Sequence, residues 1–210
     1  MKKLFAGKLS NQKIRPTMMN VAGLLCMVLI FSLSACNTGS KKTDEGQASS
    51  EDQMEKHEEK QMAKASMDAK SGSSVTGEAT FTQEDGGKVL FELLVTNLTP
   101  GEHAVHLHAN GDCSAEDGSS AGGHWNPTMK PHGKRGPGNA FHKGDIGNVT
   151  VGQDGKGTMH LDIEGWSIGG ADSTNVIGKS VIIHEKADDF TSQPSGNAGS
   201  RVSCGVIKQS

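Results

Sequence analysis

The sequence predicts an all-β domain, a sandwich or barrel of short strands, from about residue 63 to the end of the chain. Short apolar segments there are separated by Gly, Asn, Asp and Pro, and the chain of 210 residues holds 28 glycines. Asp85-Gly86-Gly87 and Gln153-Asp154-Gly155 lie between such segments, where a hairpin turn is expected. About 148 residues are enough to bury one hydrophobic core, so one domain is expected.

Eight strands are expected in this domain. The first is weak, because Ala65, Met67 and Ala69 alternate with polar residues in a segment whose helix propensity points the other way. The other seven are 75–81, 89–95, 103–108, 146–151, 157–163, 180–184 and 201–207. Two long stretches, 109–144 and 185–200, show no strand pattern, and loops of that length in a compact domain are usually functional or disordered.

The N-terminus predicts export from the cytoplasm. Five basic residues open the chain: Lys2, Lys3, Lys8, Lys13 and Arg15. An apolar run over 21–33 follows, too short for a comfortable transmembrane helix, and it ends in Leu33-Ser34-Ala35-Cys36, which resembles the lipobox of bacterial lipoproteins. Residues 1–35 are therefore expected to be a lipoprotein signal peptide, with Cys36 as the lipid-carrying membrane anchor. An uncleaved signal anchor is the alternative.

Residues 36–62 are expected to form a polar tether between this anchor and the domain. They are charged or polar and hold almost no aliphatic residues, so they cannot form a packed core. The formal net charge of the full chain is −3, and loss of the five positive charges of the signal makes it −8. Neither a basic patch nor interleaved aromatic residues indicates binding of nucleic acid.

The histidines indicate a metal site. His106 and His108 lie two positions apart in an expected strand, so both imidazoles point to one face, roughly 6.5–7 Å apart, where they can share one metal ion. Four more histidines follow, most of them in segments that also contain glycine, aspartate or proline: His124, His132, His142 and His184. Imidazole suits copper and zinc, and a nearby carboxylate such as Asp145 is compatible with zinc. One such histidine is usually a surface residue, but six with an aspartate indicate a built site.

From about residue 63 onward the chain resembles the copper/zinc superoxide dismutases of the bacterial type. The resemblance rests on these histidines, on Asp145 and on the closing stretch from Gly196 to Ile207. It implies an eight-stranded Greek-key β-barrel or sandwich, immunoglobulin-like, with one copper and one zinc ion per subunit; the family is itself a standard example of the sandwich architecture. The loop between His132 and His142 is one residue longer than in the animal enzymes.

The resemblance also implies a role for each site residue. The copper ligands would be His106, His108, His124 and His184. The zinc ligands would be His124, His132, His142 and Asp145. His124 would bridge the two metals and pass a proton to the forming peroxide, Arg201 would dock the superoxide anion beside copper, and Asp188 would link a copper histidine to a zinc histidine.

A disulfide between Cys113 and Cys204 is implied in the same way, because the family closes its active-site loop with one bridge and these two residues stand at the corresponding places. The count of four cysteines agrees, since Cys26 would leave with the signal and Cys36 would carry lipid. Two buried free thiols are the alternative, which an oxidising compartment disfavours.

The activity that the resemblance implies is dismutation of superoxide to oxygen and hydrogen peroxide, with copper carrying the electrons and redox-inert zinc in support, as a protection of the cell envelope. Two alternatives stay open: a copper-buffering lipoprotein of the same fold with little turnover, and a structural surface protein with zinc alone. Four residues are candidates for attracting the anion: Arg201, Lys186, Lys143 and Arg135. The oligomeric state, monomer or homodimer, is left open.

Overall fold

The computed structural model describes residues 60–210, which fold almost entirely into strands and loops. The strands are β1 (Met62–Ala69), β2 (Thr76–Glu84), β3 (Lys88–Thr96), β4 (Gly101–His108), β5 (Asp145–Val151), β6 (Gly157–Glu164), β7 (Ser180–His184), β8 (Arg201–Val206) and β9 (Lys208–Gln209). One 3-10 turn, η1 (Ser119–Ala121), interrupts the loop between β4 and β5. None of the helices in the described residues has the length and apolar character needed to span a membrane.

The strands form one antiparallel sheet that closes on itself. Their order is β2-β3-β6-β5-β4-β7-β8-β1-β9, and β1 also pairs with β2, which completes the ring. Some neighbouring strands are not consecutive in the chain, such as β3 beside β6 and β4 beside β7. The long connections that this order requires are those of a Greek key. The ring of strands has its least pairing between β5 and β6, which share the single residue pair Val151–Gly157. The predicted all-β barrel is confirmed.

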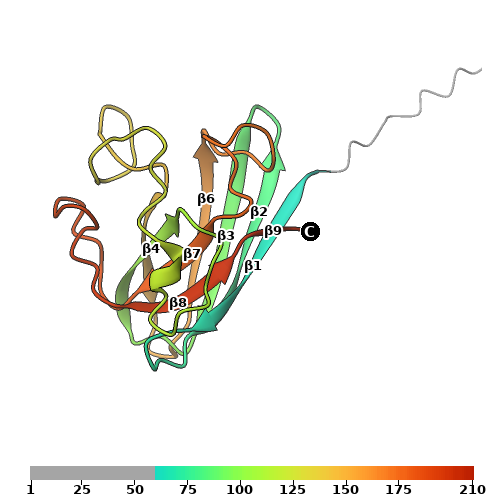
Figure 1. Ribbon diagram of the computed structural model, residues 1–210. Coiled ribbons are helices and arrows are strands. Elements are labelled where there is room, and N and C mark those ends of the chain that lie inside the picture. Colours follow the sequence, from blue (N-terminus) through green and yellow to red (C-terminus); the bar gives the residue numbers. More distant parts are fainter. Residues whose placement is uncertain (1–59) are drawn as a thin grey trace, which may run out of the picture. The chain divides into compact units, whose positions relative to one another are not determined.

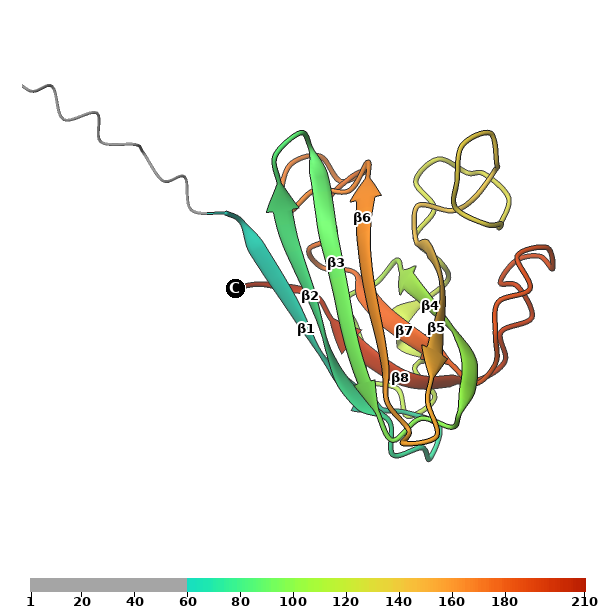
Figure 2. The same ribbon diagram turned by 180° about the vertical axis from the view of Figure 1, so that it is seen from behind.

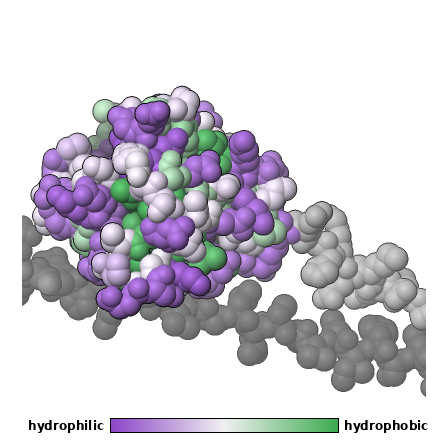
Figure 3. Space-filling view, turned by 90° about the horizontal axis from the view of Figure 1, so that it is seen from below, coloured by the Kyte–Doolittle hydropathy of each residue, from purple (hydrophilic) through white to green (hydrophobic). Residues whose placement is uncertain are grey.

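One hydrophobic core fills the barrel. Alternate residues of each strand point inward, as Ala63, Ala65 and Met67 do in β1. An aromatic cluster of Phe81, Phe91 and Trp166 lies in this core, with ring centroids 5.2 to 6.1 Å apart. The outer surface is mainly hydrophilic in the face that Figure 3 shows, with small apolar areas between polar ones.

The observed strands match the eight predicted ones with small shifts of their ends. The first begins at Met62, and its last residue Ala69, which still pairs with Ser203 of β8, is exposed rather than buried. The ninth strand, β9, was not predicted, since two residues are too few to show alternation. It pairs with Ala63 and Lys64 of β1, so the C-terminal end of the chain lies against the first strand.

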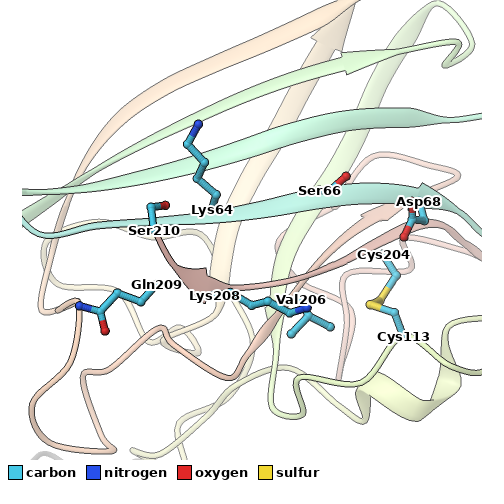
Figure 4. Close-up of a pocket in the computed structure, with 9 residues that line it drawn as sticks. All are labelled: Lys64, Ser66, Asp68, Cys113, Cys204, Val206, Lys208, Gln209 and Ser210. Atoms are coloured by element: carbon cyan, nitrogen blue, oxygen red, sulfur yellow. A yellow bond between two sulfur atoms is a disulfide. The ribbon is translucent and has the colours of Figure 1, made fainter.

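Both long loops lie on the same side of the barrel (Figures 1 and 2). One of them, 109–144, is fastened to β8 by a disulfide between Cys113 and Cys204, whose Cα atoms are 5.8 Å apart. Figure 4 shows this bridge next to outward-facing residues of β1, among them Asp68. A bridge that closes so long a segment stabilises the folded chain by about 4–5 kcal/mol in the chain-entropy model. The predicted disulfide is confirmed.

Candidate metal centre

The first group of donor residues lies on the outer face of the barrel strands. In β4, Val105 and Leu107 point into the core, so His106 and His108 point outward, yet both are buried because the long loops cover this face. β4 pairs with β7, which brings His184 beside them. The pairing register shifts at His106 and at His184, and such bulges re-aim the side chain that they carry.

His124 reaches the same place from the loop 109–144. The loop segment around it lies along β4, where the Trp125 amide donates to the Leu107 carbonyl at 2.8 Å and the Leu107 amide donates to the Gly144 carbonyl at 2.8 Å. The ring centroids of His106 and His124 are 4.0 Å apart. Backbone contacts to a rigid strand therefore position this loop histidine.

Four histidines form the first cluster, and each offers a ring nitrogen within 4.8 Å of the others: His106, His108, His124 and His184. Four buried ring nitrogens of this cluster have no hydrogen-bond partner among the described residues: Nδ1 of His106 and Nε2 of His108, His124 and His184. Burying unpartnered polar atoms is costly, and four that converge have their simplest explanation in a bound metal ion. The residues present therefore fit a metal ion held by imidazoles.

The second ring nitrogen of the strand histidines is occupied, which fixes the orientation of each ring. Nε2 of His106 donates to Asp188 Oδ2 at 2.8 Å, and Nδ1 of His108 donates to the Gly122 carbonyl at 2.8 Å. Nδ1 of His184 donates to the Gly199 carbonyl at 3.2 Å. Such bonds set the tautomer, so the unpartnered nitrogen of each ring carries the free lone pair that a metal needs.

Burial keeps these imidazoles neutral. It lowers the pKa of His106 to about 4 and that of His184 to about 3, and it holds the pKa of His108 well below its usual value. Neutral imidazole is the form that binds metals. At neutral pH the cluster therefore needs no loss of protons from these three residues before it binds an ion.

The second cluster is built around one carboxylate. Its members, within 4.8 Å of one another, are His124, His132, His142 and Asp145. Nδ1 of each histidine lies near the Asp145 carboxylate, at 2.8 Å for His124, 3.0 Å for His132 and 3.3 Å for His142. Three imidazoles and one carboxylate make a donor set that suits zinc.

The Asp145 carboxylate is ionised. Burial alone would raise its pKa, but hydrogen bonds from His124 and His132 and from the backbone amides of His142 and Gly133 outweigh burial and hold the pKa well below its usual value. A permanent negative charge thus lies at the centre of the second cluster.

His124 belongs to both clusters. Its Nδ1 faces Asp145, and its Nε2 is one of the four unpartnered nitrogens of the first cluster. The two clusters are therefore joined by one imidazole ring. This is the position in which the sequence resemblance expects the bridging residue.

Asp188 provides a second link between the clusters. Its Oδ2 accepts from His106 Nε2 at 2.8 Å and its Oδ1 accepts from His132 Nε2 at 2.9 Å. The carboxylate is fully buried against Gly196, where an added Cβ would come within 1.8 Å of Asp188 Oδ1. Only glycine fits beside this carboxylate.

A pocket of about 430 Å³ opens onto the first cluster and part of the second. Its lining residues are His108, Gly123, His124, Asn126, His142, His184, Pro194, Ser195, Gly199 and Arg201. Arg201 brings a permanent positive charge, and its guanidinium donates to the carbonyls of Gly118 at 2.7 Å and Gly122 at 2.8 Å. No carboxylate lines this pocket, so it suits a small anion.

Two of the four cations expected to attract an anion lie elsewhere. Arg135 donates to backbone carbonyls and packs against aromatic rings, and the Lys143 ammonium donates to the Gly165 carbonyl. Neither residue is among those that line the pocket, and their part in attracting the anion stays a prediction. Lys186 is exposed and its stem approaches Gly199 at the pocket wall.

Sequence reasoning missed the backbone acceptors of the site. The carbonyls of Gly118, Gly122 and Gly199 orient His108, His184 and Arg201, and no side-chain pattern marks them. The one available signal was the presence of glycine at these positions in the loops.

The chain is similar to known proteins across the whole of this region. The family model for copper/zinc superoxide dismutase (SODC) matches residues 75–207. A superoxide dismutase [Cu-Zn] of Deinococcus radiodurans is 36% identical over 148 residues, which covers 64% of this chain and 78% of that protein.

Two solved structures are similar to the chain as well. A double mutant of a SOD-like protein from Bacillus subtilis aligns with a TM-score of 0.61 at 34% identity, over 68% of this chain and 94% of that one. The clock protein EA4 aligns with a TM-score of 0.62 at 38% identity, over 70% of this chain and 92% of that one.

Proposed function

Because the chain belongs to the copper/zinc superoxide dismutase family, it is an enzyme that converts superoxide to oxygen and hydrogen peroxide with copper and zinc, and we propose which residues do this and where. When bound, copper supplies the electron transfer by alternating between two oxidation states, while zinc has no redox chemistry. The residues of the chain must then hold the ions, bind the anion and deliver the proton.

Copper is assigned to the first cluster and zinc to the second. The observation that carries this assignment is the set of four buried, unpartnered nitrogens on His106, His108, His124 and His184. The zinc assignment is supported by the ionised Asp145, since a carboxylate with three imidazoles is a zinc donor set.

Substrate binding is assigned to Arg201. Its guanidinium lines the pocket together with His108, His124 and His184, and two backbone carbonyls hold it in place. Arginine stays charged at all physiological pH values, so its attraction for superoxide does not depend on its own protonation. Asp188, which connects His106 and His132, is assigned the role of orienting a ring in each cluster.

Proton delivery is assigned to His124. Its ring lines the pocket, and Nε2 has no hydrogen-bond partner among residues 60–210, so a proton on this nitrogen is free to pass to an anion bound beside it. Asp145 holds the opposite nitrogen at 2.8 Å and keeps the ring in place.

The decisive experiment is a comparison of the purified protein carrying copper and zinc with the same protein carrying zinc only. Copper-dependent turnover near the diffusion limit, about 10⁸–10⁹ M⁻¹s⁻¹, is expected. Tight copper binding without turnover would instead make the protein a copper-holding member of the family.

We also propose that the enzyme is a bacterial lipoprotein, held outside the cytoplasm by a lipid on Cys36 and acting in defence of the cell envelope. The signal at 1–35, Cys36 and most of the tether at 36–62 lie outside the described residues, so the support is their sequence. The Cys113–Cys204 disulfide adds support, because such bridges persist in oxidising compartments.

The anchor is tested with Cys36→Ala and the matched control Cys26→Ala, expressed as full chains in a bacterium that processes lipoproteins. Cys36→Ala is expected to abolish lipid attachment and move the protein out of the membrane fraction, whereas Cys26→Ala leaves both unchanged. Mass spectrometry of the N-terminus reads the outcome directly. A membrane-bound chain that still begins at Met1 would show an uncleaved anchor instead.

A further inference from the structure

Arg135 lies in the loop that carries the second cluster, three residues after His132 and seven before His142. We propose that it is a positioning residue for zinc, which holds the chain at Asp145 in place before the metal binds. The inference deepens the proposed function, because it rests on zinc occupying the second cluster.

The guanidinium of Arg135 reaches across the loop to the segment that presents Asp145. Its Nε donates to the Asp145 carbonyl at 2.8 Å, and its Nη2 donates to the Lys143 carbonyl. The two carbonyls stand on either side of Gly144. A planar fork with two donors therefore fixes both ends of one short segment in one geometry, which the rotatable donors of an ammonium group do less rigidly.

The same guanidinium is held by the barrel core. Its Cζ lies 5.4 Å from the ring centroid of Trp166 and 4.8 Å from that of Phe141. Trp166 is 2% exposed and packs against the core phenylalanines, and its Nε1 donates to the Lys143 carbonyl at 2.9 Å. The core thereby positions the loop through three hydrogen bonds. Trp166 and Arg135 both donate to the Lys143 carbonyl, and Arg135 also donates to the Asp145 carbonyl.

The contacts matter because two histidines of this cluster lie in a loop, where Arg135 adds to the ordering contacts made by Asp188 and Asp145. His132 and His142 belong to a long segment without regular strand pairing, and all three histidine rings of the cluster meet at the Asp145 carboxylate. Within residues 60–210 Arg135 forms no ion pair, so its polar contacts are these carbonyls. It ties the two ends of the segment between residues 135 and 145, which contains His142.

The test uses Arg135→Met and Arg135→Lys in the full-length protein, with Lys134→Met as the matched control. Lys134 is the exposed neighbour, whose ammonium lies 5.5 Å from the Phe190 ring centroid. Zinc affinity is measured by competition with a chelator, and cobalt(II) in the zinc position reports the donor geometry through its visible spectrum. Both Arg135 variants are expected to lose about 10–100-fold in zinc affinity and to show an altered cobalt spectrum.

Copper affinity separates positioning from general damage. Three of the four histidines of the first cluster lie on β4 and β7, which Arg135 does not contact, so copper binding is expected to change far less than zinc binding. The fold of the metal-free variants, followed by circular dichroism, is expected to match the unaltered protein. Unchanged zinc affinity in Arg135→Met overturns the inference. Full recovery in Arg135→Lys also overturns it, because charge rather than the two-donor fork would then be the cause.

Asp145→Ala distinguishes this inference from the assignment on which it rests. Zinc loss in both Asp145→Ala and Arg135→Met supports both. Zinc loss in Asp145→Ala alone overturns the role of Arg135 and leaves the site standing. Stoichiometric zinc with unchanged affinity in Asp145→Ala overturns the zinc site and the inference together.

Discussion

The two metal clusters share His124 but are constructed in different ways. His106, His108 and His184 of the copper cluster lie on β4 and β7, whose positions the barrel core fixes. His132 and His142 of the zinc cluster lie in a loop, and Asp145 is the first residue of β5. The copper cluster thus inherits its geometry from the fold, whereas the zinc cluster depends on specific side-chain contacts.

Their electrostatics differ in the same sense. Burial lowers the pKa values of the strand histidines in the copper cluster, which has no carboxylate. Burial also acts against a charge on His132, but hydrogen bonds to Asp145 and Asp188 outweigh it and raise its pKa to about 9. The copper cluster is neutral and lies mainly on strands, whereas the zinc cluster contains paired charges and lies mainly in a loop. Substitutions in the two clusters are therefore expected to have different consequences.

The sharpest separation comes from His184→Ala. Loss of a strand ligand is expected to reduce superoxide dismutation to the background rate, while zinc stays stoichiometric because His184 contributes only to the copper cluster. Stopped-flow decay of superoxide and metal analysis of the same sample measure both. His160→Ala, on the exposed outer face of β6, is the control. Undiminished turnover in the His184 variant would falsify the copper assignment.

Asp145→Ala makes the converse change. Zinc is expected to fall well below one ion per chain, and the thermal midpoint to drop by about 10 °C, since a metal at a thousand times its Kd stabilises by about 4 kcal/mol and 1 kcal/mol is worth about 2–4 °C at this size. Calorimetry with metal analysis tests this. The strand histidines should still bind copper. Equal loss of both metals would show that the two clusters do not form independently.

Asp188→Asn is expected to affect both clusters at once. Its carboxylate orients His106 and His132, so affinity for each metal should fall by about 10–100-fold. Titration of metal-free protein with each ion provides the measurement. Asp189→Asn is the matched control, because Asp189 is exposed and its carboxylate closes a turn with Thr191 and Ser192. A variant that loses one metal alone would break the link drawn between the clusters.

Arg201→Lys gives the smallest effect. Both metals should bind as before, while kcat/KM falls about tenfold, the value of one charge-assisted hydrogen bond of about 1.5 kcal/mol. Lysine keeps the charge but cannot donate to Gly118 and Gly122 with one planar fork. Initial rates at several superoxide concentrations decide the matter. A reduced copper content would mean that Arg201 supports the cluster rather than the substrate.

Much of the fold was readable in the sequence because strand alternation is a local property. The segments that became β2 and β3 show it, and β1 was recognised despite its helix-forming residues, whereas β7 was recognised as a short apolar run. β9 was not predictable, because its two residues form a strand only by pairing with Ala63 and Lys64 and show no pattern of their own. The exposure of Ala69 at the end of β1 was not predictable either, because the alternation of the sequence continues through it.

The site was predictable to a different extent. The histidines and Asp145 were recognised as metal candidates from their residue types and spacing, and the family resemblance divided them between two metals; the structure brings them together in two clusters. The contacts of Arg135 with Trp166 and with two backbone carbonyls were not predictable, because they arise only when the barrel is assembled. The lipid on Cys36 stays a prediction.

One carbonyl oxygen, that of Gly122, accepts from both His108 and Arg201. The imidazole of His108 and the guanidinium of Arg201 are therefore both held by a single peptide group. His108 lies on β4 and Arg201 on β8, so this one loop carbonyl links side chains from two strands and helps to hold them at a fixed spacing. The distance between the His108 ring and the Arg201 guanidinium thus depends on one peptide group. Changes elsewhere in the long loop that leave Gly122 in place should leave this distance unchanged.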